Sequence, residues 1–272
     1  MGGVGKKKAG TAVVIVPPII LLILLGPPPV LFLIVLIATF LGLREFQNLA
    51  LPRCTGIERS IAIGLGLLFS FVNTYGKASW LPVFLVFLLL CLSVLFLATA
   101  QDLLSTISNF AVTLFGILYI GFLLSHISLI RNLTDGKQWA LFLIATVWAG
   151  DVSAFLSGSR FGRHKLYPRI SPKKTYEGLI GGILGSIIVA LAFTRLFLPR
   201  FDVGLCILLA TGLGILGQLG DFTESMLKRS AQVKDSGSLI PGHGGMLDRL
   251  DSFLFSAPFL YYVLLFYVKE TP

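Results

Sequence analysis

The chain has 272 residues, of which 55% are hydrophobic and only 13% are charged, and its mean hydropathy is +0.88. This composition excludes an ordinary soluble domain and indicates an integral membrane protein in contact with membrane lipids. The net charge of +9 is not accompanied by a basic soluble module, so we attribute it to cytoplasmic loops and do not expect nucleic acid as a partner.

The apolar stretches predict an all-α fold, a polytopic membrane bundle of about nine transmembrane helices. They do not alternate in the way that the strands of a membrane barrel do. The candidate spans are residues 11–26, 29–43, 60–75, 81–99, 107–130, 139–158, 177–197, 203–219 and 252–268. The first two are short and flank a triple proline, so an alternative is that they form one re-entrant or hinged pair.

Basic residues are distributed unevenly over the two sides of this arrangement. If the N-terminus is cytoplasmic, sixteen Lys and Arg residues lie on that side and six on the other. The positive-inside rule therefore predicts a bacterial-type inner membrane protein whose N-terminus and active-site loops, 159–176 and 220–251, are cytoplasmic and whose C-terminus is on the opposite side.

Polar chemistry is concentrated in the second half of the chain. Residues 1–138 contain few clustered charges, and we expect them to be a membrane scaffold that contacts lipid or a second subunit. Residues 139–272 are expected to be the catalytic membrane region. Within it, Asp151 lies in an apolar span, where a carboxylate indicates function. It could support a metal site, pair with a basic residue or contact a nucleotide.

The segment RFGRHKLYPRISPKKTYE, from Arg160 to Glu177, carries six basic residues. One interpretation is positive-inside sorting with attraction to anionic lipid headgroups. Another is that Lys173 and Lys174, at the mouth of the next span, hold a substrate phosphate. The two are compatible.

Asp221, Glu224, Ser225 and Lys228 have the spacing of one helical face after the span that ends near residue 219. A carboxylate at the membrane surface is costly unless it is paired or bound to metal. Either a metal site or an internal ion pair to Lys228 would satisfy this requirement.

The segment 242–251 combines glycine with acidic residues. Gly242 to Gly245 lead into the last span, and a helix N-terminus with close backbone amides favours an anion such as phosphate. Asp248 and Asp251 share one face of that helix. Since Mg²⁺ prefers carboxylates together with phosphate oxygens, Asp221 and Asp248 could share one ion, although N-terminal capping would also explain one of the pair.

Residues 225–251, SMLKRSAQVKDSGSLIPGHGGMLDRLD, resemble the signature of the phosphatidate cytidylyltransferase (CDP-diacylglycerol synthase) family, and every fixed position of that signature is present. The resemblance is strong over about 139–268 and includes ISPKKTYEG and FGRHKL. The chain departs from the family at Val152, where a Ser or Thr is common.

The resemblance implies the reaction of CTP with phosphatidate to give CDP-diacylglycerol and pyrophosphate, with Mg²⁺ as cofactor, and it leaves a second, monovalent cation as an open alternative. It also implies a homodimer. Metal ligands would come from Asp221, Asp248 and Asp251, with Asp151 behind them. The catalytic set would be Asp221, Asp248, Lys228, Arg229 and His243, and the substrate-binding set Lys173, Lys174, Ser225, Lys234, Asp235, Gly244, Gly245 and Arg249.

Two other classes are less consistent with the sequence. A CDP-alcohol phosphotransferase would carry an Asp-Gly pair followed by Ala-Arg, and this chain does not. A transporter often has two related halves with paired broken helices, whereas the polar residues here occupy one half.

Overall fold

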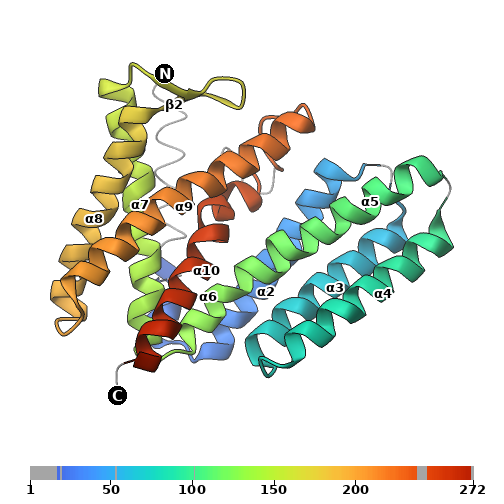
Figure 1. The fold of residues 1–272 in the computed structure, drawn as a ribbon, viewed down its shortest axis with the longest axis horizontal. Coiled ribbons are helices and arrows are strands. Elements are labelled where there is room, and N and C mark those ends of the chain that lie inside the picture. Colours follow the sequence, from blue (N-terminus) through green and yellow to red (C-terminus); the bar gives the residue numbers. More distant parts are fainter. Residues whose placement is uncertain (1–16, 19, 53, 101, 238–243, 271–272) are drawn as a thin grey trace.

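The computed structural model describes residues 17–18, 20–52, 54–100, 102–237 and 244–270, with the side chains of 268–270 left out. The elements are α2 (Pro28–Ala50), α3 (Gly56–Tyr75), α4 (Trp80–Thr99), α5 (Leu103–Gly116), η1 (Ile117–Phe122), α6 (Leu123–Arg131), α7 (Gly136–Phe161), β1 (Lys165–Tyr167), β2 (Ser171–Thr175), α8 (Tyr176–Phe197), α9 (Val203–Ser230) and α10 (Leu247–Glu270) (Figure 1).

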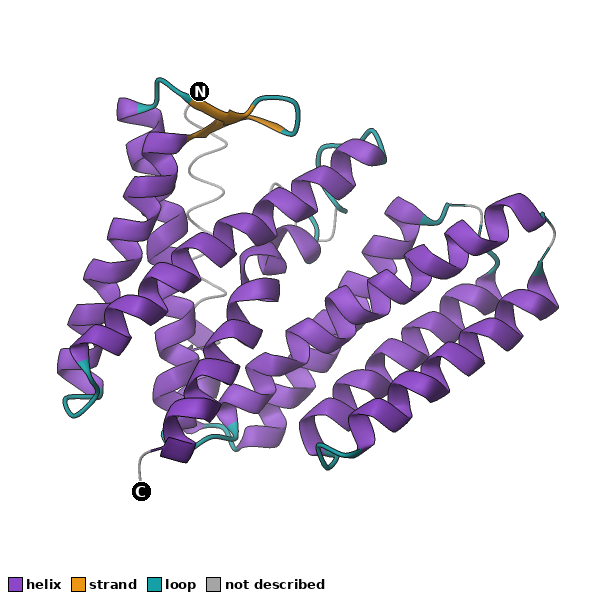
Figure 2. Cartoon of the chain, viewed as in Figure 1, coloured by secondary structure: helices purple, strands orange, loops and turns teal. Residues whose placement is uncertain are grey.

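Within those residues, eight helices are long and apolar enough to cross a membrane, if α5, η1 and α6 count as one. The predicted all-α membrane bundle is therefore confirmed (Figure 2). Residues 11–16 and 19 of the expected span 11–26 lie outside the described residues, and residues 20–25 are helical. α2 extends beyond the expected 29–43 to Ala50, and its 23 residues are long enough to cross alone.

Local signals account for where several helices begin. Thr55 and Glu58 form a capping box at the start of α3, and the side chains of Asp102, Thr175 and Asp202 accept hydrogen bonds from the first turns of α5, α8 and α9. Pro28 occupies the first turn of α2, where no intrahelical N–H bond is lost. These caps satisfy N–H groups that have no partner within the helix and so define where each helix begins.

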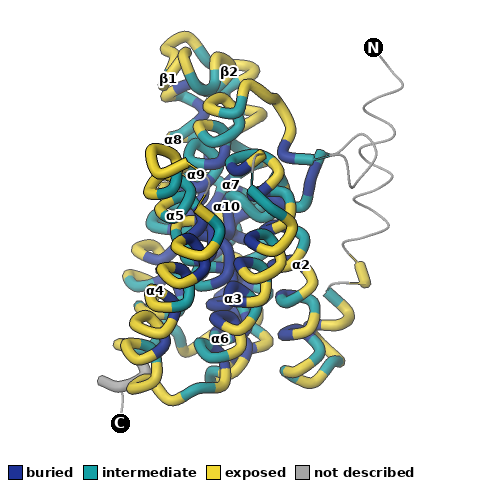
Figure 3. The backbone as a smooth tube through the Cα atoms, turned by 90° about the vertical axis from the view of Figure 1, so that its right-hand side faces the viewer, coloured by how far each residue is buried: buried dark blue, intermediate teal, exposed yellow. Residues whose placement is uncertain are grey.

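The helices form two groups. α2 to α6 make one, α7 to α9 make the other, and α10 lies between them (Figure 1). α10 packs on α9 and also on α6, so apolar clusters on both sides share its residues. The outer helix α4 leaves much of its surface exposed, as expected for a lipid contact (Figure 3).

α7 and α8 pack closely through small residues. A Cβ atom at Gly181 would lie 2.0 Å from Ser157 Oγ, and one at Gly185 would lie 2.1 Å from Ser153 Oγ. Small residues at such positions let two membrane helices approach each other. This contact fixes Asp151, on α7, relative to the start of α8.

The loop between α7 and α8 forms a β-hairpin, which the sequence interpretation did not include. β1 and β2 pair antiparallel, with Lys165 opposite Thr175 and Tyr167 opposite Ser171. The His164 Nδ1 atom lies 2.6 Å from Glu177 Oε1 at the foot of the hairpin. The basic segment is thus an ordered projection at one end of the bundle (Figure 1).

Candidate active site

Most of the charged residues singled out in the sequence gather at the hairpin end of the bundle. The ends of α7 and α9 and the start of α10 lie at this end, because successive helices alternate in direction (Figure 1). α9 continues for eleven residues past the predicted end of its span, and α10 begins five residues earlier than predicted. The polar residues therefore lie on rigid helical extensions of the two spans.

Lys174 binds Asp221. Its Nζ atom lies 2.8 Å from Asp221 Oδ2 and 4.0 Å from the centre of the Phe222 ring. Lys173 is exposed on the other face of the strand, because neighbouring strand residues point to opposite sides. The structure therefore separates the two lysines that the sequence treated as a pair.

Lys228 connects two carboxylates. Its ammonium group forms ion pairs with Glu224, one turn earlier on α9, and with Asp248 on α10, where Nζ to Oδ1 is 2.6 Å. The Glu224 side chain is fully buried. The internal ion pair to Lys228 that the sequence allowed is present and is formed by Glu224, while Asp221 pairs with Lys174 instead.

The other carboxylate oxygen of Asp248 holds the loop that precedes α10. Oδ2 accepts hydrogen bonds from the Ser236 N–H and hydroxyl, both at 2.9 Å, and from the Gly245 N–H at 2.8 Å. Gly244 has a φ of +81°, and a Cβ there would lie 2.4 Å from Asp248 Oδ2, so this position requires glycine. With Lys228, four donors occupy the accepting positions of Asp248.

Asp251 lies among the remaining carboxylates. The negative charges of Asp221, Glu224 and Asp151 are close enough to repel it. A Cβ at Gly220 would lie 2.2 Å from the Asp251 carbonyl oxygen, so α9 and α10 touch at this point. Asp151 accepts a 3.4 Å hydrogen bond from the Ser252 hydroxyl. The sequence left its partner open, and the structure brings it to α10.

Glu45, on α2, is a site residue that the sequence interpretation did not include. Its carboxylate accepts hydrogen bonds from the N–H groups of Met246, at 2.8 Å, and Leu247, at 2.9 Å, and from the Ser236 hydroxyl, at 3.0 Å. An acidic group at the start of α10 satisfies free amides and the helix dipole. The only sequence signal was a carboxylate near the end of an apolar span.

The remaining candidates surround this centre. The Ser225 hydroxyl donates to Asp221 Oδ1 at 3.3 Å. Arg229 donates to the carbonyl oxygens of Ile170, at 3.3 Å, and Val233, at 3.0 Å, which ties the hairpin to α9. The side chains of Lys234, Asp235 and Arg249 are exposed. His243 and Gly242 lie outside the described residues.

A divalent cation is chemically compatible with this centre. The centre contains five acidic residues, of which three form the ion pairs with Lys174 and Lys228 described above: Asp151, Asp221, Glu224, Asp248 and Asp251. Over the described part of the chain, however, no three acidic, histidine or cysteine side chains are grouped closely enough to enclose a metal. The protein could therefore supply only part of a ligand set, as is usual for Mg²⁺ bound with phosphates.

Comparison with known proteins identifies the family. The model of the cytidylyltransferase family matches residues 6–267. The chain belongs to this family. Similar proteins include the phosphatidate cytidylyltransferase of Bacillus subtilis (strain 168), 35% identical over 85% of this chain and 84% of that protein, and that of Staphylococcus aureus (strain COL), 34% identical over 84% and 87%. The family expected from residues 225–251 is confirmed.

Proposed function

We propose that the chain is a phosphatidate cytidylyltransferase, which transfers the cytidylyl group of CTP to phosphatidate. In this reaction a phosphate oxygen of phosphatidate forms a bond to the α-phosphorus of CTP. The bond from the α-phosphorus to the bridging oxygen of the β-phosphate breaks, and pyrophosphate leaves. The products are CDP-diacylglycerol and pyrophosphate, and no covalent enzyme intermediate is required.

The observation that carries the proposal is that Lys174, from the hairpin, meets Asp221 beside the ion pair of Lys228 and Asp248. Both substrates are anions, so their approach is opposed by charge. Two lysines, held by carboxylates at the end of membrane helices, can bind phosphates of the nucleotide and the lipid in one place. Positioning and electrostatic stabilisation of this kind supply most of the catalysis in phosphoryl transfer.

We further propose Mg²⁺ as cofactor. Asp221 and Asp251 are the first candidates for its ligands, since Asp248 already accepts from four donors. Asp248 would become a ligand, as the sequence predicts, if one donor such as Lys228 moved to substrate. When bound, the ion would neutralise phosphate charge and orient the triphosphate. A second, monovalent cation and a homodimer remain predictions.

We also propose that the hairpin end faces the cytoplasm, where CTP is available. The basic segment 160–174 and the loop 231–237 lie at this end (Figure 1), in agreement with the positive-inside rule. Fusions of a reporter that works only in the cytoplasm would test this orientation. The reporter should be active within the hairpin and inactive at the C-terminus, and activity at the C-terminus would contradict the proposal.

The activity is tested with purified protein in detergent, CTP labelled in the cytosine and phosphatidate. We expect lipid-dependent pyrophosphate release in equal amount to labelled CDP-diacylglycerol. Diacylglycerol, which lacks the attacking phosphate, serves as the matched negative control. Equal pyrophosphate release with and without phosphatidate, or no product from folded protein with Mg²⁺ present, would refute the proposal.

A further inference from the structure

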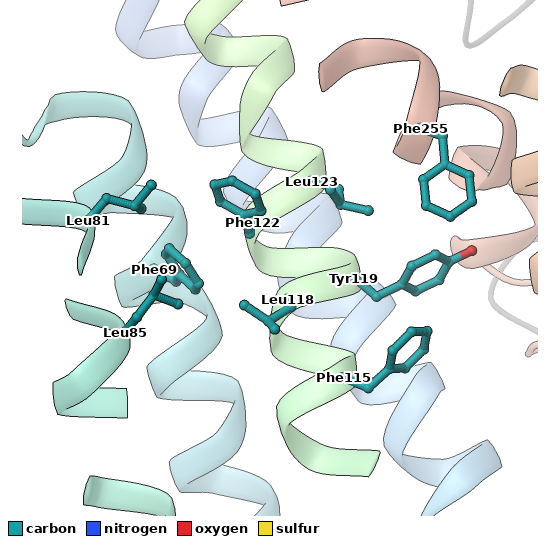
Figure 4. Close-up of a pocket in the computed structure, with 9 residues that line it drawn as sticks. All are labelled: Phe69, Leu81, Leu85, Phe115, Leu118, Tyr119, Phe122, Leu123 and Phe255. Atoms are coloured by element: carbon teal, nitrogen blue, oxygen red, sulfur yellow. The ribbon is translucent and has the colours of Figure 1, made fainter. Parts of the chain in front are cut away.

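An apolar groove crosses the membrane-facing surface between α4 and α10. It has a volume of about 340 Å³, and its walls include Leu85, Phe115, Leu118, Phe122 and Phe255 (Figure 4). Leu85 and Phe115 are 37% and 41% exposed, so the groove is open to its surroundings. Because these helices are long and apolar enough to cross a membrane, lipid chains are the surroundings that we expect for the groove.

Tyr119 supplies the polar group of this groove. Its ring stacks on Phe115 at a centroid distance of 5.1 Å and meets Phe255 edge-on at 5.9 Å. The residue is only 3% exposed, and its hydroxyl has no hydrogen-bond partner among the described residues. A buried tyrosine hydroxyl normally has one, so this donor lacks the partner that such groups usually find.

The groove leads to the acidic centre. Phe255 lies one turn after Asp251 on α10, on the same face of the helix. The Tyr119 ring contacts Phe255, so Tyr119 lies next to the turn of α10 that begins at Asp251. Tyr119 therefore lies between the apolar groove on one side and the candidate phosphate site on the other.

The segment that carries Tyr119 packs closely against two neighbouring helices. A Cβ at Gly116 would lie 2.5 Å from the Phe46 ring, and one at Gly121 would lie 2.7 Å from the Gly66 carbonyl oxygen, so this segment is pressed against α2 and α3. Residues 117–122 form a π-helical turn, a feature that often occurs at functional sites.

We propose that this groove binds an acyl chain of phosphatidate and that the Tyr119 hydroxyl donates a hydrogen bond to an oxygen of the same lipid, an inference that rests on the function proposed above. The acyl chain of the lipid then stays in apolar surroundings along its whole length. The phosphate is brought to Lys174 and Asp221, and the hydroxyl gains the partner that the protein does not give it.

The groove is tested by filling it. In Leu85→Trp an indole ring, larger than the leucine side chain, enters the groove. Leu89→Trp is the control, because Leu89 lies one turn further on α4, is similarly exposed at 44%, and does not line the groove. We expect Leu85→Trp to raise KM for dioleoyl phosphatidate by about fivefold or more. KM for CTP and for dihexanoyl phosphatidate, whose chains are too short to fill the groove, should change little.

The hydroxyl is tested by Tyr119→Phe, which keeps the ring. We expect KM for both lipids to rise about three- to tenfold, from the loss of one hydrogen bond, with KM for CTP and the unfolding temperature unchanged. An unchanged KM for the lipids in Tyr119→Phe, or equal effects of the two tryptophan variants, would overturn the groove proposal. Turnover of dihexanoyl phosphatidate in the same assays would still support the enzyme function. Absence of turnover with either lipid would refute the enzyme function itself.

Discussion

The contact of Glu45 with the start of α10 joins the two groups of helices at the candidate active site. Glu45→Gln keeps the size of the side chain but removes its charge. In the structure Oε2 accepts from Leu247 N–H and the Ser236 hydroxyl, and Oε1 accepts from Met246 N–H. A glutamine can present its oxygen to only one of these groups of donors, so its NH₂ group must face an N–H.

The cost can be worked from those contacts. One hydrogen bond to a charged group, worth about 1.5–3 kcal/mol, is lost, and the favourable interaction of an anion with the helix N-terminus, about 0.3–1 kcal/mol, goes with it. The sum is about 3 kcal/mol, which corresponds to a factor of about a hundred in a local opening equilibrium. We expect the N–H groups of Gly245 to Leu247 to exchange about a hundredfold faster and turnover to fall.

Hydrogen exchange followed by mass spectrometry on the whole protein in lipid nanodiscs measures this directly. Arg44→Gln is the matched control, since Arg44 is the exposed neighbour on α2 and also loses one charge. Exchange within a few-fold of the unmodified protein in Glu45→Gln, or an equal increase in Arg44→Gln, would refute the reasoning.

Three further predictions concern the centre itself. Lys228→Met should destabilise the fold by about 3–5 kcal/mol, because its two carboxylate partners lose their counter-charge, and a thermal melt with no change would contradict this. Gly220→Ala should abolish activity, since its Cβ would lie 2.2 Å from the Asp251 carbonyl oxygen, whereas Gly64→Ala, with open space around it, should leave activity intact. Activity in excess chelator should vanish and return with Mg²⁺, and Asp221→Asn should raise the Mg²⁺ concentration needed; activity that survives chelation would exclude the metal proposal.

What the sequence predicted well depends on helical periodicity. Asp221, Glu224, Ser225 and Lys228 do lie on one helix, because their spacing follows 3.6 residues per turn, and Asp248 and Asp251 do open the last helix. The spans were found by hydropathy, but their ends were not, since polar residues continue α9 and α10 beyond the apolar runs.

Contacts between distant parts of the chain were beyond this kind of reasoning. The hydrogen bonds of Glu45 join residues 191 to 202 positions apart, and no local pattern encodes them. Lys173 and Lys174 were treated alike because a loop was expected, whereas a strand turns neighbouring side chains to opposite faces. Tyr119 gave no signal at all, since an aromatic residue in an apolar helix is ordinary.

The charges of the centre bear on how it could bind its anionic substrates. Five carboxylates, Asp151, Asp221, Glu224, Asp248 and Asp251, lie at this centre, and two lysines, Lys174 and Lys228, form ion pairs with three of them. A triphosphate and a lipid phosphate would bring further negative charge to these carboxylates, so positive charge must accompany them. Because each lysine is already held by a carboxylate, a cation that takes over a carboxylate would free a lysine for phosphate. A metal ion bound with the nucleotide is therefore the source of positive charge that we propose for this site.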